Sequence, residues 1–477
     1  MKRYEKLAEQ IAEMIRSGLL APRDRVPSVR QASARFGVSP STVFQAYYLL
    51  ESRGLVRARE RSGYYVCDNA QQQLPQLTRS NPTVQSTEVS ISDLVFSVLD
   101  TVGDSGMGLL GAAFPAPELF PLEKLGQSLG RSNRMLARDA VNKNLSPGND
   151  VLRQAIARRY MSAGVPVGAD DIIVTNGALE GLTLALQTLT RPGDTVAIES
   201  PGFYAALQLI QMLDLRAIEI PMNPNEGMDL EVLEDALDNN DIRACWSMTS
   251  FQNPLGSSMS QPRKQALVTL LARYSVPLIE DDVYGELYFG ATYPQPAKRF
   301  DEHGLVVHCG SFSKSLAPGY RIGWIVPGRY FEAVRRAKLT TSLSASVPAQ
   351  LAIADYLQRG HYDRHLRKLR ILLEDQQSEM TAAIADSFPA GTRVSRPRGG
   401  YFLWVELPGD IDTLRLYRRA LQRGINFAPG PMFSASGEYR NCMRLNYGLA
   451  PHCIRPAIEA LAQLLETSAA DPAPRGE

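Results

Sequence analysis

A single lysine, Lys314, follows a short apolar run and is surrounded by hydroxyl and guanidinium side chains. Ser311 and Ser313 precede it, and Arg321 follows seven residues later. Burial and a neighbouring cation both lower the pKa of a lysine, because both disfavour the charged ammonium. A lysine in this setting is suited to act as a neutral amine that attacks a carbonyl group and forms a Schiff base.

Polar residues also follow the other short apolar runs, and together they match the parts of one cofactor. In chain order they are Asn176-Gly177-Ala178, Phe203-Tyr204, Asn253, Asp281 and Tyr284. Free N–H groups at a helix N-terminus can hold a phosphate, and a carboxylate can keep a pyridine nitrogen protonated. Pyridoxal 5'-phosphate (PLP) combines a phosphate, a pyridine ring and an aldehyde that a neutral lysine would attack. The sequence therefore predicts a PLP site centred on Lys314.

These residues can meet only if the apolar runs form one sheet. Seven short β-rich runs, from DIIVT (171–175) to RIGWIV (321–326), alternate with amphipathic segments such as ALEGLTLALQTL (178–189). This alternation is typical of an α/β domain with a largely parallel central sheet. Because ligands bind at the carboxyl ends of the strands in such sheets, we expect the polar residues to lie along one edge.

The first 66 residues have a different pattern. Apolar residues recur at helical spacing over residues 4–15, VRQASARF (29–36) ends at a glycine, and Ser39 is placed to cap a third helix. LVRARERSGYYV (55–66) then predicts two strands around a tight turn. Three helices and a hairpin indicate a winged helix-turn-helix. This head carries 12 Lys and Arg against 6 Asp and Glu, whereas the rest is mildly acidic, so we expect only the head to bind a polyanion.

The run RVPSVRQASARFGVSPSTVFQAYYLLESRGLVRARERSGYYV (25–66) resembles the DNA-binding domain of the GntR family of bacterial regulators. The resemblance implies contacts with double-stranded DNA from Arg30, Ser39, Ser41, Thr42, Gln45, Arg61, Ser62 and Gly63. One position departs from the family, because Pro40 stands where many members have an arginine. A guanidinium that could read guanine is therefore missing, and the base preference of relatives cannot be carried over.

The string SFSKSLAPGYRIGW (311–324) resembles the PLP-lysine motif of fold-type I aminotransferases. LRQAIARRY (152–160), GGYFLWVEL (399–407) and MRLNYG (443–448) add to the likeness, which extends over residues 110–465. The resemblance implies an α/β body that holds PLP at the carboxyl edge of its sheet.

The expected organisation follows from the two resemblances and from composition. The body is expected over residues 93–466, with a large part over 110–328 and a smaller C-terminal α/β part over 329–466. Residues 67–92 are rich in Gln, Ser, Thr, Asn and Pro, which indicates a flexible linker. A tail over 467–477 is expected to be disordered.

The aminotransferase resemblance implies a role for each polar residue. Lys314 would form the Schiff base, Asp281 would pair with the pyridine nitrogen, and Phe203 would stack on the ring, with Tyr204 the weaker choice. Arg444 would receive the α-carboxylate of an amino-acid ligand as a bidentate pair. The phenolate oxygen would be contacted by Asn253 and Tyr284, and the phosphate by Gly177, Ala178, Ser311, Ser313 and Arg321.

One stretch of the body departs from the aminotransferase pattern. Members of this family commonly have a tyrosine that reaches the phosphate of the partner subunit, but NKNLSPGNDVLR (142–153) has no tyrosine near Lys143. This departure puts in doubt the contact across a dimer and full catalytic competence. It does not affect the bond between Lys314 and the cofactor.

A GntR-type head on an aminotransferase-like body resembles the MocR subfamily of bacterial transcriptional regulators. The resemblance implies a homodimer that binds promoter DNA and responds to PLP or to an amino-acid adduct of PLP. The alternative is a catalytically active PLP-dependent aminotransferase with an accessory DNA-binding head. A regulator without significant turnover is the favoured interpretation, and a DNA-binding scaffold with an empty pocket is the weakest because the cofactor residues are all present.

The remaining composition argues for a protein of the cytoplasm. The chain has 477 residues, of which 44% are hydrophobic, enough for more than one folded domain. Its five cysteines are scattered without metal-binding spacing, so neither disulfides nor a metal is expected. The N-terminus has no apolar signal segment, and no long apolar run occurs. We therefore expect a soluble, cytoplasmic protein.

Overall fold

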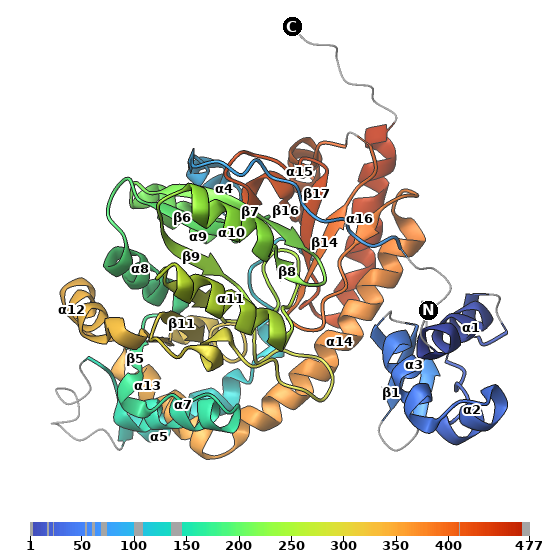
Figure 1. The fold of residues 1–477 in the computed structure, drawn as a ribbon, viewed down its shortest axis with the longest axis horizontal. Helices are drawn as coiled ribbons and strands as arrows, with labels where there is room; N and C mark the ends of the chain where they lie inside the picture. The colour runs from blue at the N-terminus through green and yellow to red at the C-terminus, as the bar shows by residue number, and fades with distance from the viewer. Residues whose placement is uncertain are drawn as a thin grey trace, which may run out of the picture. The chain divides into compact units, whose positions relative to one another are not determined.

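The computed structural model of the chain contains two compact units, one formed chiefly by the residues up to Pro75 and one chiefly by those from Gln76 onwards (Figure 1). The residues that it describes are 3–16, 19–21, 23–52, 55–59, 63–67, 74–99, 108–134, 146–409 and 411–469.

The head is the expected winged helix-turn-helix. Its elements are α1 (Arg3–Arg16), α2 (Val29–Phe36), α3 (Pro40–Ser52) and the antiparallel strands β1 (Val56–Arg59) and β2 (Gly63–Val66). Its core consists of apolar residues from each element, including Ile11, Ala32, Val43 and Val56. Val43, Ala46, Tyr47 and Leu50 of α3 are all fully buried, as their helical spacing predicted.

Capping residues fix where the two helices of the helix-turn-helix begin. Ser28 and Gln31 form a capping box at the start of α2, which satisfies two backbone N–H groups reciprocally. Gly37 ends α2 with a φ of +61°, a conformation that favours glycine. Ser39 Oγ accepts the backbone N–H of Thr42 at 3.2 Å, and Pro40 is the first residue of α3, a position where its missing N–H has no cost.

The body is built on a nine-stranded, mostly parallel sheet. In spatial order its strands are β3 (Thr87–Glu88), β7 (Arg216–Asn223), β6 (Thr195–Ser200), β9 (Ile242–Ser247), β10 (Leu278–Asp281), β11 (Val306–Ser311), β12 (Gly323–Val326) and β5 (Ile173–Thr175), with β8 (Gly227–Met228) beside β7. The strands from β7 to β11 are parallel, and β12 is antiparallel to both β11 and β5. All seven predicted apolar runs are strands of this sheet.

Helices flank the sheet on its connections (Figure 1). They are α4 (Ser92–Leu99), α5 (Leu122–Arg134), α7 (Asp150–Ser162), α8 (Ala178–Leu189), α9 (Tyr204–Met212), α10 (Leu230–Asn239), α11 (Gln261–Arg273), α12 (Phe331–Thr341), α13 (Val347–Gln358) and α14 (His361–Ser387). The strands are buried along almost their whole length, as expected for a parallel sheet covered on both faces.

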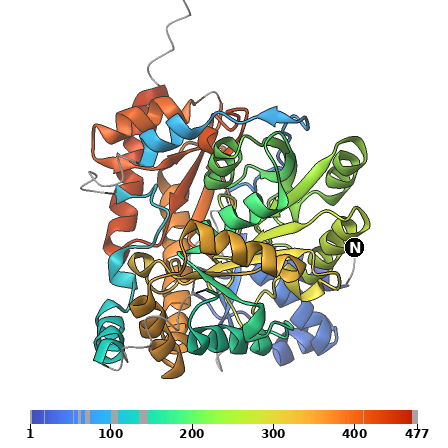
Figure 2. The same ribbon diagram turned by 90° about the vertical axis from the view of Figure 1, so that its left-hand side faces the viewer.

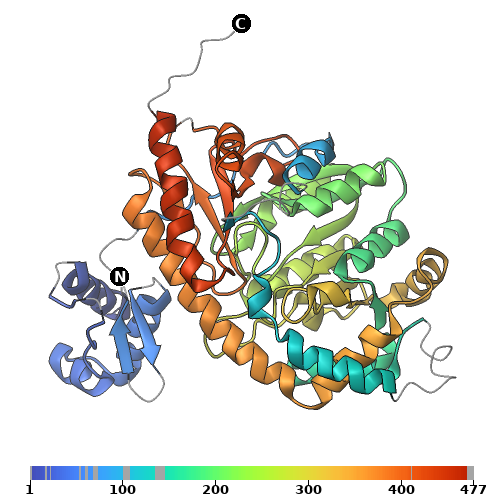
Figure 3. The same cartoon turned by 180° about the vertical axis from the view of Figure 1, so that it is seen from behind.

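A smaller antiparallel sheet forms the C-terminal part. Its strands are β13 (Arg393–Val394), β14 (Phe402–Glu406), β17 (Cys442–Asn446) and β16 (Ala428–Pro429). Helices α15 (Thr413–Leu421) and α16 (Pro451–Ala469) accompany it (Figure 3), and β15 (Ile425–Asn426) pairs with β4 (Gly108–Leu109). Within the described residues, no helix combines the length and the apolar character needed to cross a bilayer.

The second half of the expected linker is part of the body, so the prediction of a flexible linker over 67–92 is wrong for residues 80–92. Strand β3 pairs with the edge strand β7, and the light-blue segment that carries it lies on the body (Figure 2). Ser80 Oγ donates to the carbonyl of Ser200 at 2.6 Å and accepts the backbone N–H of Met222 at 2.7 Å. The polar composition that indicated a linker supplies hydrogen-bond partners to the open edge of the sheet. Likewise, α16 extends to Ala469, into the expected tail.

Candidate functional site

The register of three strands brings the phosphate-binding candidates to one edge of the sheet. Thr175 at the end of β5 lies opposite Gly323 at the start of β12, and Gly323 lies opposite Ser311 at the end of β11. The loops that leave these positions carry Gly177 and Arg321. Two antiparallel pairings thus assemble residues that are well over a hundred positions apart in the sequence.

Gly177 and Arg321 form a cradle at the N-terminus of α8. Gly177 is the N-cap residue with a φ of +78°, and a Cβ at this position would lie 2.5 Å from Arg321 Nη2, so only glycine leaves room for the guanidinium. Thr175 Oγ1 donates to the Gly177 carbonyl at 2.8 Å. Arg321 Nη1 donates to Ser313 Oγ at 3.4 Å. Backbone N–H groups at a helix N-terminus and a guanidinium beside them are suited to bind an anion.

An ion pair between Glu180 and Lys338 supports the cradle through the backbone of Asn176. The sequence analysis did not predict it. Glu180 Oε2 accepts the backbone N–H of Asn176 and the ammonium of Lys338, each at 2.6 Å, and Ser342 donates to the same carboxylate. The Lys338 side chain is fully buried. Burial opposes the ionisation of Glu180, but hydrogen bonds from Lys338 and Ser342 outweigh it and lower its pKa. The partners lie 158 residues apart, and Lys338 has no motif around it.

Lys314 lies three residues after the end of β11, with its ammonium group near cationic and aromatic side chains. Burial, with the nearby charges of Arg444 and Arg321, lowers the pKa of Lys314 to about 7, while Asp281 acts in the opposite direction. Its Nζ donates to the carbonyl of Ala113 at 2.7 Å and lies 3.8 Å from the ring centre of Phe114. A substantial fraction of Lys314 is therefore neutral at neutral pH, as its sequence setting indicated.

Asp281, the last residue of β10, is a buried carboxylate without a cationic contact. It is 1% exposed, and neither carboxylate oxygen takes part in a hydrogen bond of normal length. Burial raises the pKa of Asp281 to about 7, although the charge of Lys314 opposes the rise. A buried acid in this condition suits a partner that brings a proton or a positive charge, as a pyridine nitrogen does.

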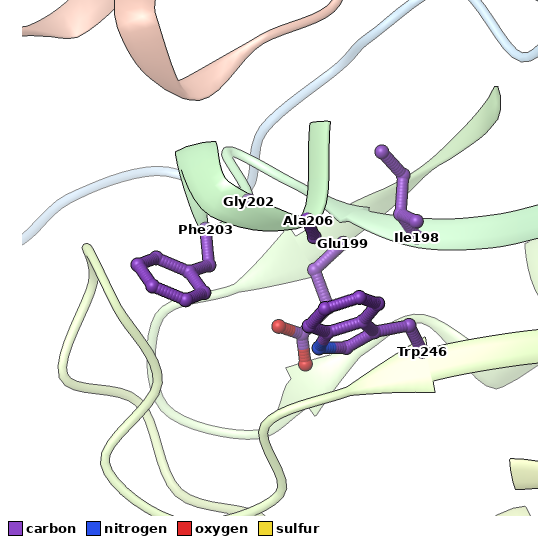
Figure 4. A pocket seen from close by; sticks show the side chains of 6 residues that line it. All are labelled: Ile198, Glu199, Gly202, Phe203, Ala206 and Trp246. Carbon is purple, nitrogen blue, oxygen red and sulfur yellow. The ribbon is translucent and has the colours of Figure 1, made fainter. Parts of the chain in front are cut away.

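Phe203 and Tyr204 adjoin each other at the start of α9 but have different surroundings. Tyr204 is buried and packs edge-on against Phe433, whereas the ring of Phe203 lines a small cavity with Glu199 and Trp246 (Figure 4). The cavity has a volume of about 10 Å³, which is at the lower limit for one water molecule and too small for a cofactor. Burial raises the pKa of Glu199 to about 8.

Arg444 on β17 is buried and contacts two segments that are distant in the sequence. Its Nη1 donates to Asn253 Oδ1 at 3.0 Å, and its Nη2 donates to the carbonyls of Gly111 at 2.7 Å and Ala112 at 3.4 Å. The guanidinium lies 4.1 Å from the ring centre of Phe402. Burial lowers the pKa of Arg444, although an arginine stays charged. The site thus contains a desolvated guanidinium whose contacts include the main-chain carbonyls of Gly111 and Ala112.

The segment 110–116 covers this part of the site through its carbonyl groups. The carbonyls of Gly111, Ala112 and Ala113 accept from Arg444 and Lys314, and the Tyr401 hydroxyl also donates to Ala113 at 3.1 Å. The sequence did not predict these main-chain contacts. Carbonyl contacts carry no residue signature, so no sequence signal could have found them.

The described residues fit PLP. The glycine cradle with its guanidinium suits a phosphate, the partly neutral lysine suits an aldehyde, and the unpartnered Asp281 suits a pyridine nitrogen. Tyr284 is buried, and burial raises its pKa, which keeps its hydroxyl a donor. Asn253 Nδ2 is buried without a partner among the described residues and is a second free donor. The stretch around Lys143 lies outside the described residues, so the missing tyrosine is not placed.

In the head, most of the predicted DNA-contacting residues are accessible. Arg30, Ser41, Gln45 and Gly63 are exposed, and Gly63 has a φ of +105°. Thr42 is half-buried. The hydroxyl of Ser39 caps α3 and lies 2.9 Å from Ser41 Oγ and 2.8 Å from Thr42 Oγ1. Arg61 and Ser62 lie outside the described residues.

Comparison with known families agrees with the two-part architecture. Residues 125–461 match the model of aminotransferase class I and II, and residues 3–66 match that of the bacterial regulatory proteins of the gntR family. The chain belongs to the class I and II aminotransferase family. Joined to a gntR-type head, this body gives the arrangement of the MocR subfamily, as the sequence indicated.

The chain is similar both to proteins named transcriptional regulators and to proteins named aminotransferases. The uncharacterized HTH-type transcriptional regulator YdcR of Escherichia coli (strain K12) is 45% identical over 94% of this chain and 95% of its own length. Aromatic-amino-acid aminotransferase 1 of Thermococcus litoralis is 32% identical over 77% of this chain and 90% of its own. The crystal structure of Pyrococcus horikoshii kynurenine aminotransferase has a TM-score of 0.73, with 30% identity over 79% of this chain and 94% of that one. The chain is a GntR-type regulator fused to an aminotransferase domain.

Proposed function

We propose that the chain is a DNA-binding transcriptional regulator that holds PLP on Lys314 and responds to PLP or to an amino acid bound with it. One observation carries the proposal. The same chain joins a basic winged helix-turn-helix to a site where a lysine with a pKa of about 7 adjoins a buried, unpartnered carboxylate, Asp281.

Each part of the cofactor has residues that would hold it. The phosphate would be bound by Gly177, Ala178, Ser311, Ser313 and Arg321, the pyridine nitrogen by Asp281, the phenolate oxygen by Asn253 and Tyr284, and the ring face by Phe203. When bound, PLP supplies an aldehyde that condenses with amines and a protonated ring that withdraws electrons from an attached amino acid.

The chain's own residues set the protonation and the binding of the ligands. Because the pKa of Lys314 is about 7, its amine is available as a nucleophile, and after displacement by another amine it can take up a proton. Arg444 offers two parallel N–H donors to an α-carboxylate. Since Asn253 and the carbonyl of Gly111 now accept from Arg444, a carboxylate must displace at least one of these contacts.

An effector can regulate only if it binds one arrangement of the molecule better than another. The exchange of a main-chain carbonyl for a carboxylate at Arg444 supplies such a difference, because the 110–116 segment must then move. Relatives named HTH-type transcriptional regulators share the whole head-and-body length, which supports a role for the body in regulation.

The direct test measures fluorescence anisotropy of a duplex from the region upstream of the chain's own gene. Wild type and Lys314→Ala would be titrated with and without PLP. We expect PLP to change the affinity or the salt dependence of the wild type, and Lys314→Ala to be indifferent to PLP. Identical binding under all PLP and amino-acid conditions would refute the regulatory role of the cofactor, and no specific binding would refute the regulator itself.

A working aminotransferase is the second candidate, supported by the intact set of cofactor residues and by the likeness to a protein named aromatic-amino-acid aminotransferase 1. Its test is sustained production of a keto acid from an amino donor. Turnover abolished by Lys314→Ala would establish it, whereas a single slow half-reaction would not, because an exposed Schiff base can undergo it without turnover.

A further inference from the structure

Helix α3 exposes two aromatic rings on the face opposite its core. Val43, Ala46, Tyr47 and Leu50 are fully buried. The opposite face carries Ser41, Phe44, Gln45 and Tyr48. Phe44 is 54% exposed and Tyr48 is 64% exposed, and their spacing of four residues places them one above the other on the helix.

Such exposure is unusual for a phenylalanine and suggests a ligand. Among the described residues of the head, the exposed large hydrophobic side chains are Leu19, Phe44 and Tyr48. Two of the three therefore share one face of one helix. Clustered exposed rings mark binding surfaces more often than scattered single ones do.

The charge around this helix favours a polyanion as the occupant. Residues 25–50 contain Arg25, Arg30 and Arg35 and no acidic residue. Neither α2 nor α3 has an acidic side chain in its first turn. A protein or lipid partner of ordinary composition would not require the absence of carboxylates here. The phosphates of a DNA backbone would, because they repel carboxylates.

We infer that Phe44 reads thymine by contact with its C5-methyl group in the major groove, with Tyr48 packing against the neighbouring sugar-phosphate. This inference rests on the proposed DNA-binding function. The N-terminal residues of a recognition helix approach the base edges most closely, and Phe44 is the fifth residue of α3 while Tyr48 is the ninth. A phenyl ring makes the apolar contact that distinguishes thymine. Pro40 offers no base-reading donor, so apolar readout by Phe44 beside the amide of Gln45 takes its place.

The test removes single methyl groups from DNA. The preferred duplex is first selected from randomised DNA with the full-length protein, and each thymine in it is then replaced by deoxyuridine. For wild type we expect at least one replacement to weaken binding about fourfold, the equivalent of ~0.8 kcal/mol for one buried methyl-sized group. For Phe44→Ala we expect thymine and deoxyuridine to bind equally at that position.

Two further variants separate methyl readout from other effects. Phe44→Met keeps an apolar side chain and should retain part of the preference. Leu19→Ala removes the exposed apolar side chain that lies outside α3 and should keep all of it. Circular dichroism would show that each variant is folded, as expected for an exposed position.

Each other outcome overturns the inference in a distinguishable way. A wild type that binds thymine and deoxyuridine equally at every position refutes methyl readout while leaving DNA binding intact. An equal loss for both bases in Phe44→Ala shows that the ring contacts only the backbone. A change in molar mass of Phe44→Ala with unchanged DNA binding assigns the face to a second copy of the chain. Failure to select any motif refutes the proposed DNA-binding function together with this inference.

Discussion

Replacement of Asp281 by asparagine should stabilise the PLP-free protein while weakening its hold on the cofactor. The carboxylate is buried, both oxygens lack a hydrogen-bond partner, and burial raises its pKa to about 7. In the unfolded chain the pKa is about 3.9, so folding at pH 8 costs roughly 4 kcal/mol at 1.36 kcal/mol per pKa unit. Asparagine has the same shape and no charge, so this cost disappears.

The stability difference between Asp281→Asn and wild type should depend on pH in a defined direction. Because the pKa of Asp281 is raised in the folded state, its contribution to stability is fully present below about pH 4 and is lost as the pH rises towards 7. The advantage of Asp281→Asn should therefore be near zero at pH 4 and grow to a maximum above pH 7.

The assay is the unfolding midpoint of the body, followed by near-ultraviolet circular dichroism in urea at several pH values. PLP added at a fixed excess should raise the midpoint of wild type more than that of Asp281→Asn. Asp235→Asn is the matched control, because Asp235 is exposed on α10, and its midpoint should follow wild type throughout. An advantage of Asp281→Asn that does not vary with pH, or a less stable variant at pH 8, would show that the reasoning about the unpartnered carboxylate is wrong.

Three other predictions concern the cradle, the carboxylate site and the head. Glu180→Gln leaves the buried ammonium of Lys338 without its carboxylate partner, with only the hydroxyl of Ser342 to accept from it, and should lower the free energy of unfolding by about 3 kcal/mol. The double variant Glu180→Gln/Lys338→Met should recover part of this loss. Titration with PLP should show weaker phosphate binding only in a variant in which the backbone N–H of Asn176 has lost its hydrogen bond to residue 180. Arg444→Lys replaces a bidentate donor and should weaken amino-acid binding by roughly 1.5–3 kcal/mol, while PLP absorbance is unchanged. Arg30→Ala should reduce the magnitude of the slope of log affinity against log salt by about 0.9, as measured by anisotropy, and an unaltered slope would remove Arg30 from the phosphate contacts.

The sequence predicted those features that depend on a pattern within one continuous segment of the chain. The strand before Asp281 and the strand before Lys314 were predicted because buried parallel strands are continuous apolar runs. The edge of the sheet where their polar residues meet follows from the direction of those strands. Tyr47 and the other core positions of α3 follow from helical periodicity.

The missed features depend on contacts between distant segments. The pairing of Glu180 with Lys338 requires the folded position of α12, which no local pattern encodes. The contact of Ala113 with Lys314 is made by a main-chain carbonyl, which every residue has. Strand β3 was interpreted as linker because two residues are too few to show the alternation of apolar and polar side chains that predicts a strand. Its pairing depends on the free edge of β7 beside it.

The attachment of Ser80 to the body has a consequence for the length of chain that connects it to the head. Had all of residues 67–92 been free, the tether could have reached roughly 90 Å, at 3.6 Å per residue. With Ser80 hydrogen-bonded at the ends of β6 and β7, 13 residues separate it from Val66 at the end of β2, and a chain of that length can span at most roughly 50 Å. A shorter tether raises the effective concentration of the head around its own body. In the homodimer that the family resemblance implies, two heads would have to reach successive turns of a DNA duplex, about 34 Å apart. The spacing of half-sites would then depend on the anchor at Ser80 as well as on the head.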